Sequence, residues 1–284
     1  PPRPGRKMTD ITTEGASIAF DKVGKAFTKY VELDQPWVVV NLVAVPEFSL
    51  DPHQWCYPVV GCQAYRGYFN LERARKEQAR FNAQDYDTFI GAVTAYSTLG
   101  WFNDPLHTGF TSLPDDRMVA LMFHELAHQV VYIKEDTAFN ESFATAVEIA
   151  GVTSWIHHRR SQGANAQIAT DNELENFHRS IDNKMAFIAL IKKTQTSLAL
   201  IYGETNGEAR RSQKEQAFAE LKMQLTEFAN SHASRRHYAG WAKHVNNAKL
   251  VPIDSYYRWV ENISRHLSQR LKLNECAIAD LSNQ

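Results

Sequence analysis

The sequence lacks a charge excess of either sign and a long apolar run. Its 284 residues contain 31 Lys and Arg against 32 Asp and Glu, which gives a formal net charge of −1 at pH 7. Nucleic-acid backbones bind proteins with a strong positive field, so we expect no nucleic-acid partner. The longest strongly apolar stretch, residues 37–45, is much shorter than the roughly 20 residues of a membrane-spanning helix. We therefore expect no transmembrane segment.

Cysteine is also scarce, because the chain has only 3 of them. That number excludes a scaffold built from disulfides. Cys56 and Cys62 lie in one short segment, WCYPVVGC, whose spacing fits a small disulfide loop and two reduced thiols equally well. Cys276 lies near the end of the sequence, and we expect it to be unpaired.

The hydrophobic content of 44% with 11% aromatic residues is ordinary for a chain that buries a core. We therefore expect a folded protein and not a disordered one. The first ten residues, PPRPGRKMTD, contain neither an initiating Met nor an apolar signal core. Localisation, the native N-terminus and the oligomeric state therefore stay open at this stage.

Hydrophobic spacing predicts strands in the first part of the chain and helices in the rest. The predicted elements before residue 114 are a helix over 14–33, a buried strand over 37–45, irregular strand and turn over 55–69, a helix over 70–83 and one or two strands within 85–102. Asn70 is the expected N-cap of the second of these helices.

Five helices are predicted after Pro114, over 115–133, 140–160, 172–202, 208–231 and 254–273, with Gly151 and Pro252 near ends or gaps. Strands followed by helices indicate the α+β class, with a small N-terminal sheet and a mostly helical C-terminal part. We expect a tail over 1–13, a catalytic core over 14–160 and a helical subdomain over 161–284.

The sharpest motif is HExxH in the segment FHELAHQV, which contains His124, Glu125 and His128. Positions i and i+4 lie on the same face of a helix, so the two imidazoles can bind one metal ion while Glu125 flanks it. Apolar residues around the motif predict that this helix is buried. The motif is typical of zinc metallopeptidases.

Catalytic zinc sites usually have three protein ligands, so a third must lie downstream. The metzincin pattern is excluded, because Val131 and Lys134 replace its Gly and His. A carboxylate is then expected, and Glu141 is the best candidate because it opens a second amphipathic helix that can fold back on the first. Asp136 and Glu135 are alternatives, although Asp136 is more simply a helix cap. The remaining interpretation is that the two histidines lie on an ordinary helix face that binds no metal.

The segment NESFA after HELAH resembles the NExxA signature of gluzincin metallopeptidases, in which the Glu is the third zinc ligand. A longer set of segments is similar to the bacterial family of predicted aminopeptidases, and this resemblance runs from about residue 36 to 260. The segments are VVNLVAVPEFSL, WCYPVVGCQAYRGYF, AYSTLGWFNDP, FHELAHQVVYIKEDTAFNESFATAVE and WAKHVNNAKL. The resemblance implies a zincin-like fold, Zn²⁺ as the cofactor and a peptide substrate.

Members of this family are typically exported and often carry a lipoprotein signal. The resemblance therefore implies an extracytoplasmic location, periplasmic or membrane-anchored, with a lipid anchor on a missing N-terminus. In an oxidising compartment a disulfide between Cys56 and Cys62 is favoured over two free thiols.

The motif predicts a mechanism in which zinc lowers the pKa of a water and polarises the scissile carbonyl, while Glu125 transfers the proton to the leaving amine. Only twelve residues separate His128 from Glu141, fewer than in thermolysin, so the substrate subsites of that enzyme do not transfer. No motif for binding a free amino terminus is evident. The alternatives to an aminopeptidase are a zinc endopeptidase and a non-catalytic binding module stabilised by zinc.

Several further residues are weaker candidates. Glu148 lies on the same helical face as Glu141 and could accept a hydrogen bond from a ligand imidazole, although a surface role fits equally. In zincins an edge strand binds extended substrate, which makes Tyr96, Ser97 and Gly100 subsite candidates. The candidate oxyanion donors are Tyr65, Arg66, Tyr68, Asn246, Asn247 and Tyr256. The basic stretch Arg210, Arg211 and Lys214 is expected to be a solvated face.

Overall fold

The computed structural model describes residues 29–35, 37–58, 61–93, 105–111, 113–133, 136–161, 171–257, 259–265 and 267. The chain divides into two compact units. Unit 1 comprises Pro1–Val38, Thr94–Leu174 and Ser255–Gln284, and unit 2 comprises Val39–Val93 and Glu175–Asp254. Each unit is thus assembled from segments that are distant in sequence. The subdomain boundary expected near residue 160 stays a prediction.

A three-stranded sheet forms the centre of unit 2. Strand β2 (Val39–Pro46) lies in the middle and pairs antiparallel with β5 (Arg66–Tyr68) and β6 (Tyr86–Val93). Alternate residues of β2 point to opposite faces, yet both sets are buried. Leu42 packs in one core with Trp55, and Val43 packs in another with Ala248. The predicted buried strand is therefore confirmed.

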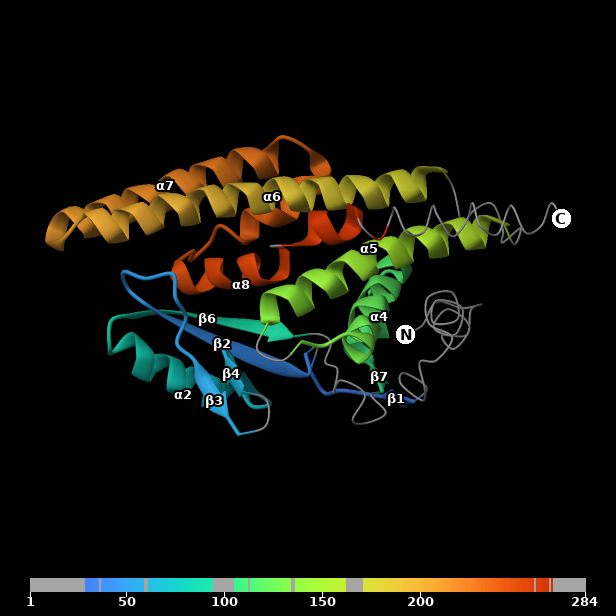
Figure 1. Cartoon of the computed structure of the whole chain (residues 1–284), viewed down its shortest axis with the longest axis horizontal. Helices are drawn as coiled ribbons and strands as arrows, with labels where there is room; N and C mark the ends of the chain where they lie inside the picture. Colours follow the sequence, from blue (N-terminus) through green and yellow to red (C-terminus); the bar gives the residue numbers. More distant parts are fainter. Residues whose placement is uncertain are drawn as a thin grey trace. The chain divides into compact units, whose positions relative to one another are not determined.

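Helices cover both faces of this sheet (Figure 1). Helix α2 (Leu71–Asn82) contributes Phe81 to the core around Leu42, and α8 (Asn247–Tyr257) contributes Ala248 to the other core. Asn70 caps α2 as predicted, because its side chain accepts a hydrogen bond from Arg73 N at 3.0 Å. Covered faces explain why β2 is apolar on both sides.

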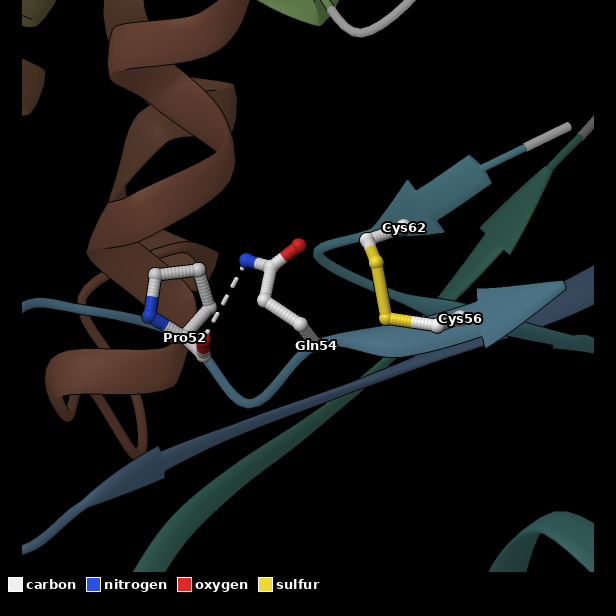
Figure 2. The surroundings of a disulfide bond; sticks show 4 residues. All are labelled: Pro52, Gln54, Cys56 and Cys62. Carbon is white, nitrogen blue, oxygen red and sulfur yellow. Dashed lines mark hydrogen bonds between the residues drawn. A yellow bond between two sulfur atoms is a disulfide. The ribbon is translucent and has the colours of Figure 1, made fainter.

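A short hairpin carries the disulfide of unit 2. Strands β3 (Trp55–Tyr57) and β4 (Gly61–Gln63) are antiparallel, and Cys56 lies directly opposite Cys62. The two residues form a disulfide (Figure 2). Opposed positions on neighbouring strands bring the two Cβ atoms close together, which is what such a bridge needs.

Two long helices form a hairpin in unit 2 (Figure 1). Helix α6 (Asp171–Glu204) and α7 (Gly207–Asn230) agree with the predicted ranges, and Lys193 of α6 pairs with Glu220 of α7 at 3.8 Å. The 3-10 helix η1 (Ala233–Gly240) follows. The helix predicted over 254–273 is wrong at its start, because α8 begins at Asn247 and contains Pro252 within it. Residues 260–265 are also helical.

Lys214 of α7 contradicts the expected solvated face. Its side chain is buried, and its Nζ donates to the Glu47 carbonyl at 2.7 Å and to Asp87 Oδ2 at 2.9 Å. Helical spacing places Lys214 on the same face as Phe218 and Leu221, which are also buried, so the charge needs a partner there. Arg211 remains exposed and pairs with Glu47 at 3.2 Å.

Unit 1 contains a two-stranded parallel ladder and the helices of the motif. Strand β1 (Tyr30–Val31) pairs with β7 (Leu106–His107), which precedes α3 (Thr108–Thr111), α4 (Asp115–Val130) and α5 (Thr137–Ser161). The helix predicted over 14–33 is wrong at its end, because the backbone at residues 29–31 bonds to β7. The rest of that prediction lies outside the described residues.

The described residues are mostly helical with small sheets, which confirms the α+β class. The zincin-like arrangement stays a prediction. Among the helices of the described residues, none is long and apolar enough to cross a membrane.

Candidate metal centre

Helix α4 presents the HExxH motif from a buried position. Met118, Met122 and Leu126 are buried, and the motif residues His124 and Glu125 are each 8% exposed. Asp115 and Asp116 lie in the first turn, where carboxylates stabilise the positive end of the helix dipole. The predicted buried motif helix is confirmed, although it ends at Val130 and not at residue 133.

Helix α5 packs against α4 (Figure 1). The face of α5 that carries Glu141 and Glu148 meets His124 of α4. Gly151 lies on this face, and a Cβ atom at Gly151 would lie 2.5 Å from Cγ of the Phe123 ring. The glycine therefore allows the two helices to approach closely beside His124. Its expected place at a helix end is wrong, because Gly151 lies in the interior of α5.

Three side chains converge on one point between these helices. Glu141 Oε2 lies 3.2 Å from His124 Nε2 and 3.8 Å from His128 Nε2, and the three ligand atoms lie within 4.8 Å of one another. Tetrahedral zinc with bonds of about 2.1 Å separates its ligand atoms by roughly 3.4 Å. The two distances to Glu141 lie near that spacing, and two imidazoles with one carboxylate are a usual donor set for a metal ion such as zinc. The three residues could therefore hold a metal ion.

Glu148 contacts the other nitrogen of the first imidazole. Its Oε2 lies 3.4 Å from His124 Nδ1, and its side chain is only 17% exposed. A carboxylate in this place holds the imidazole ring in orientation and directs Nε2 toward Glu141, where a metal ion could bind. The structure thus places Glu148 against His124 and not on the open surface.

The pKa values of the two imidazoles shift in opposite directions. Burial lowers the pKa of both. For His124 the hydrogen bonds to Glu141 and Glu148 outweigh burial and raise the pKa to about 10. For His128 burial prevails and lowers the pKa to about 4. Glu141 and Glu148 both face the His124 ring, and carboxylates close to a partly enclosed group favour a cation there.

Asp136 and Glu135 are the alternatives to Glu141 as the third metal ligand. Asp136 is the cap of α5, because its Oδ1 accepts a hydrogen bond from Phe139 N at 2.9 Å, as the capping interpretation predicted. It does not belong to the group of possible ligands found among the described residues. Glu135 lies outside the described residues.

Most of the remaining weaker candidates lie outside the described residues or in unit 2. Tyr96, Ser97 and Gly100 lie outside the described residues. Tyr65 and Asn247 belong to unit 2, where Asn247 donates to the Glu47 carbonyl at 2.8 Å and accepts from the Tyr202 hydroxyl at 2.8 Å. Arg66 and Tyr68 both bind Glu77, and Asn246 donates to the Thr88 carbonyl at 3.0 Å. Their predicted substrate roles stay predictions.

The helix pair, with a buried His124 and the partly buried His128 and Glu141, is a group that could hold a metal ion. The sequence profile of a family described as "Putative aminopeptidase" matches residues 20–282. The chain belongs to this family, which confirms the resemblance to the aminopeptidase family. Comparison with curated proteins and with solved structures finds no match.

Proposed function

We propose that the protein is a zinc-dependent peptidase of the gluzincin type that removes residues from the amino end of peptides. The observation that carries the proposal is the group of His124, His128 and Glu141 with Glu125 beside it on α4. The family description supports a peptidase that acts at the amino end.

Each residue of the group has a distinct role in this proposal. His124, His128 and Glu141 hold zinc, and Glu148 fixes the ring of His124. A zinc ion held by these residues would supply Lewis-acid chemistry, because it would lower the pKa of a water to about 7 and polarise the peptide carbonyl. Glu125 takes the proton from the attacking water and delivers it to the leaving amine. Burial of Glu125 beside the donors strengthens its electrostatic interaction with them.

The test compares zinc content and peptide cleavage of the wild type and Glu125→Gln. We expect the variant to keep zinc and to lose activity by about 10²–10⁴-fold, because the general base is gone. Glu77→Gln is the control, since Glu77 is a partly buried carboxylate of unit 2. Unchanged hydrolysis by Glu125→Gln would reject the assigned base.

The substrate end is tested with one peptide in two forms. An aminopeptidase cleaves the peptide with a free amino terminus and spares the acetylated one. Cleavage of both forms would show an endopeptidase. Stoichiometric zinc without cleavage of either form would favour the binding module.

We also propose an extracytoplasmic location, periplasmic or membrane-anchored. The disulfide between Cys56 and Cys62 supports it, because such bonds persist in oxidising compartments. Fractionation combined with thiol alkylation tests the proposal. Labelling of Cys56 and Cys62 in the native protein from cells would contradict it.

A further inference from the structure

Asn140 holds the backbone of the segment before α5 from both sides. Its Oδ1 accepts a hydrogen bond from Ile133 N at 2.8 Å, and its Nδ2 donates to Ile133 O at 2.7 Å. Asn140 is 3% exposed, so water does not compete for these bonds. A single amide side chain thus binds both backbone groups of one residue. We call this contact the Asn140 clamp.

The clamp belongs to a series of bonds that joins the end of α4 to the start of α5. Val131 N donates to Ala127 O at 3.0 Å where α4 ends. Asp136 N donates to Ile133 O at 3.3 Å, and Asn140 N donates to Asp136 O at 3.1 Å. Ala127 directly precedes the ligand His128, and Asn140 directly precedes Glu141. The series therefore begins and ends one residue from a metal-binding position.

We propose that Asn140 is a positioning residue that sets the place of Glu141 relative to the two imidazoles, and so sets the affinity of the site for zinc. This inference rests on the proposed metal site. Glu141 lies in the first turns of α5, where the preceding segment decides the position of the backbone. Metal–ligand distances tolerate only about 0.2 Å of error, so a small shift of α5 weakens binding.

The chemistry of the clamp requires an amide. Ile133 offers one donor and one acceptor, and among side chains of this length only Asn offers the complementary pair. Leu has nearly the same shape but no hydrogen bonds, and Ala removes both the bonds and the volume. Asn140→Leu therefore isolates the hydrogen bonds from packing.

The experiment measures zinc affinity by competition with a chelator for the wild type, Asn140→Leu and Asn140→Ala. We expect both variants to bind zinc about 10–100-fold more weakly, the range seen when residues supporting a metal ligand are removed. Asn183→Ala is the matched control, because Asn183 is 4% exposed and binds Ser234 and Arg235 in unit 2. The control should lose stability but keep wild-type affinity for zinc.

A second measurement needs no variant. If the clamp strengthens zinc binding, zinc must strengthen the clamp by the same factor. Hydrogen exchange at the Ile133 amide of the wild type should therefore slow by about tenfold or more when zinc is added, beyond any slowing at the amide of Ser234.

Each outcome decides one question. Equal zinc affinity of Asn140→Leu and the wild type, or equal slowing at Ile133 and Ser234, would overturn the inference while leaving the metal site intact. A wild type that binds no zinc would overturn both the inference and the proposed function.

Discussion

Each unit of the protein encloses a group of titratable side chains, but the two groups differ in the kind of side chain that meets the carboxylates. In unit 2, Lys214 donates to the Glu47 carbonyl and to Asp87. Asp87 also accepts from Asn247 N, and the Asn247 side chain binds the Glu47 carbonyl and Tyr202. One positive charge meets one carboxylate, and the neighbouring polar groups hydrogen-bond one another.

In the group of unit 1, two carboxylates meet two imidazoles. Glu141 and Glu148 both face His124, and Glu141 also faces His128, whose lowered pKa keeps that ring neutral. Carboxylates and the lone pair of a neutral imidazole are metal ligands, whereas Lys is not. The comparison shows that burial of charge alone does not identify a functional site. The convergence of possible metal ligands on one point distinguishes the group of unit 1 from that of unit 2.

The strongest test of this contrast is Glu141→Ala. Loss of the third ligand should lower zinc affinity and peptidase activity by on the order of 10³-fold, because two imidazoles alone complete neither the charge nor the geometry of the site. Asp136→Ala is the control, since it removes the α5 cap and costs about 1 kcal/mol of folding stability. Chelator competition measures both variants. A larger loss of zinc affinity in Asp136→Ala would reverse the ligand assignment.

Lys214→Met tests the structural group of unit 2. The variant keeps the length of the side chain but leaves the Asp87 carboxylate without its cation, so unfolding free energy should fall by about 3 kcal/mol. Zinc content should not change. Denaturant titration measures the loss, and the additional change Asp87→Asn should restore part of it. A loss near zero would show that the pair behaves like an exposed one.

A pair of glycine substitutions gives the smallest effect. Gly151→Ala places a methyl group against the Phe123 ring and should lower stability by about 1–3 kcal/mol, with weaker zinc binding because α5 moves relative to α4. Gly203→Ala near the end of α6 has open space within 4 Å and should raise stability by up to about 1 kcal/mol. Thermal unfolding compares the two. Equal effects would mean that the α4–α5 contact is looser than described.

Local signals explain why part of the fold was predictable. The cap at Asn70 and the apolar run of β2 depend on neighbouring residues in the chain, and both predictions are confirmed. The HExxH spacing is equally local, because the helix itself brings positions i and i+4 together.

The wrong predictions depend on contacts between residues that are distant in sequence. Tyr30 and Val31 have helical spacing but form β1, because β7 offers their backbone a partner that is distant in sequence. Lys214 reads as a surface residue, and only the packing of α7 beside Asp87 makes it buried. Gly151 is expected near a helix end, but it lies inside α5 against the Phe123 ring, where a side chain would not fit. Each wrong prediction depends on a tertiary contact that the local sequence pattern does not encode.

The sequence by itself determined the pair of imidazoles at His124 and His128, the carboxylate of Glu125 within the same motif, and the class of the fold. Periodicity and motif spacing act within one element, so they can be recognised without the tertiary structure. The tertiary structure decided that Glu141 and not Asp136 meets the imidazoles and that Glu148 supports His124. It also decided that Asn140 of α5 binds the backbone of Ile133 in the segment between the two helices. The physical reason is that ligand geometry depends on how α5 packs against α4, and packing joins residues that no short pattern links.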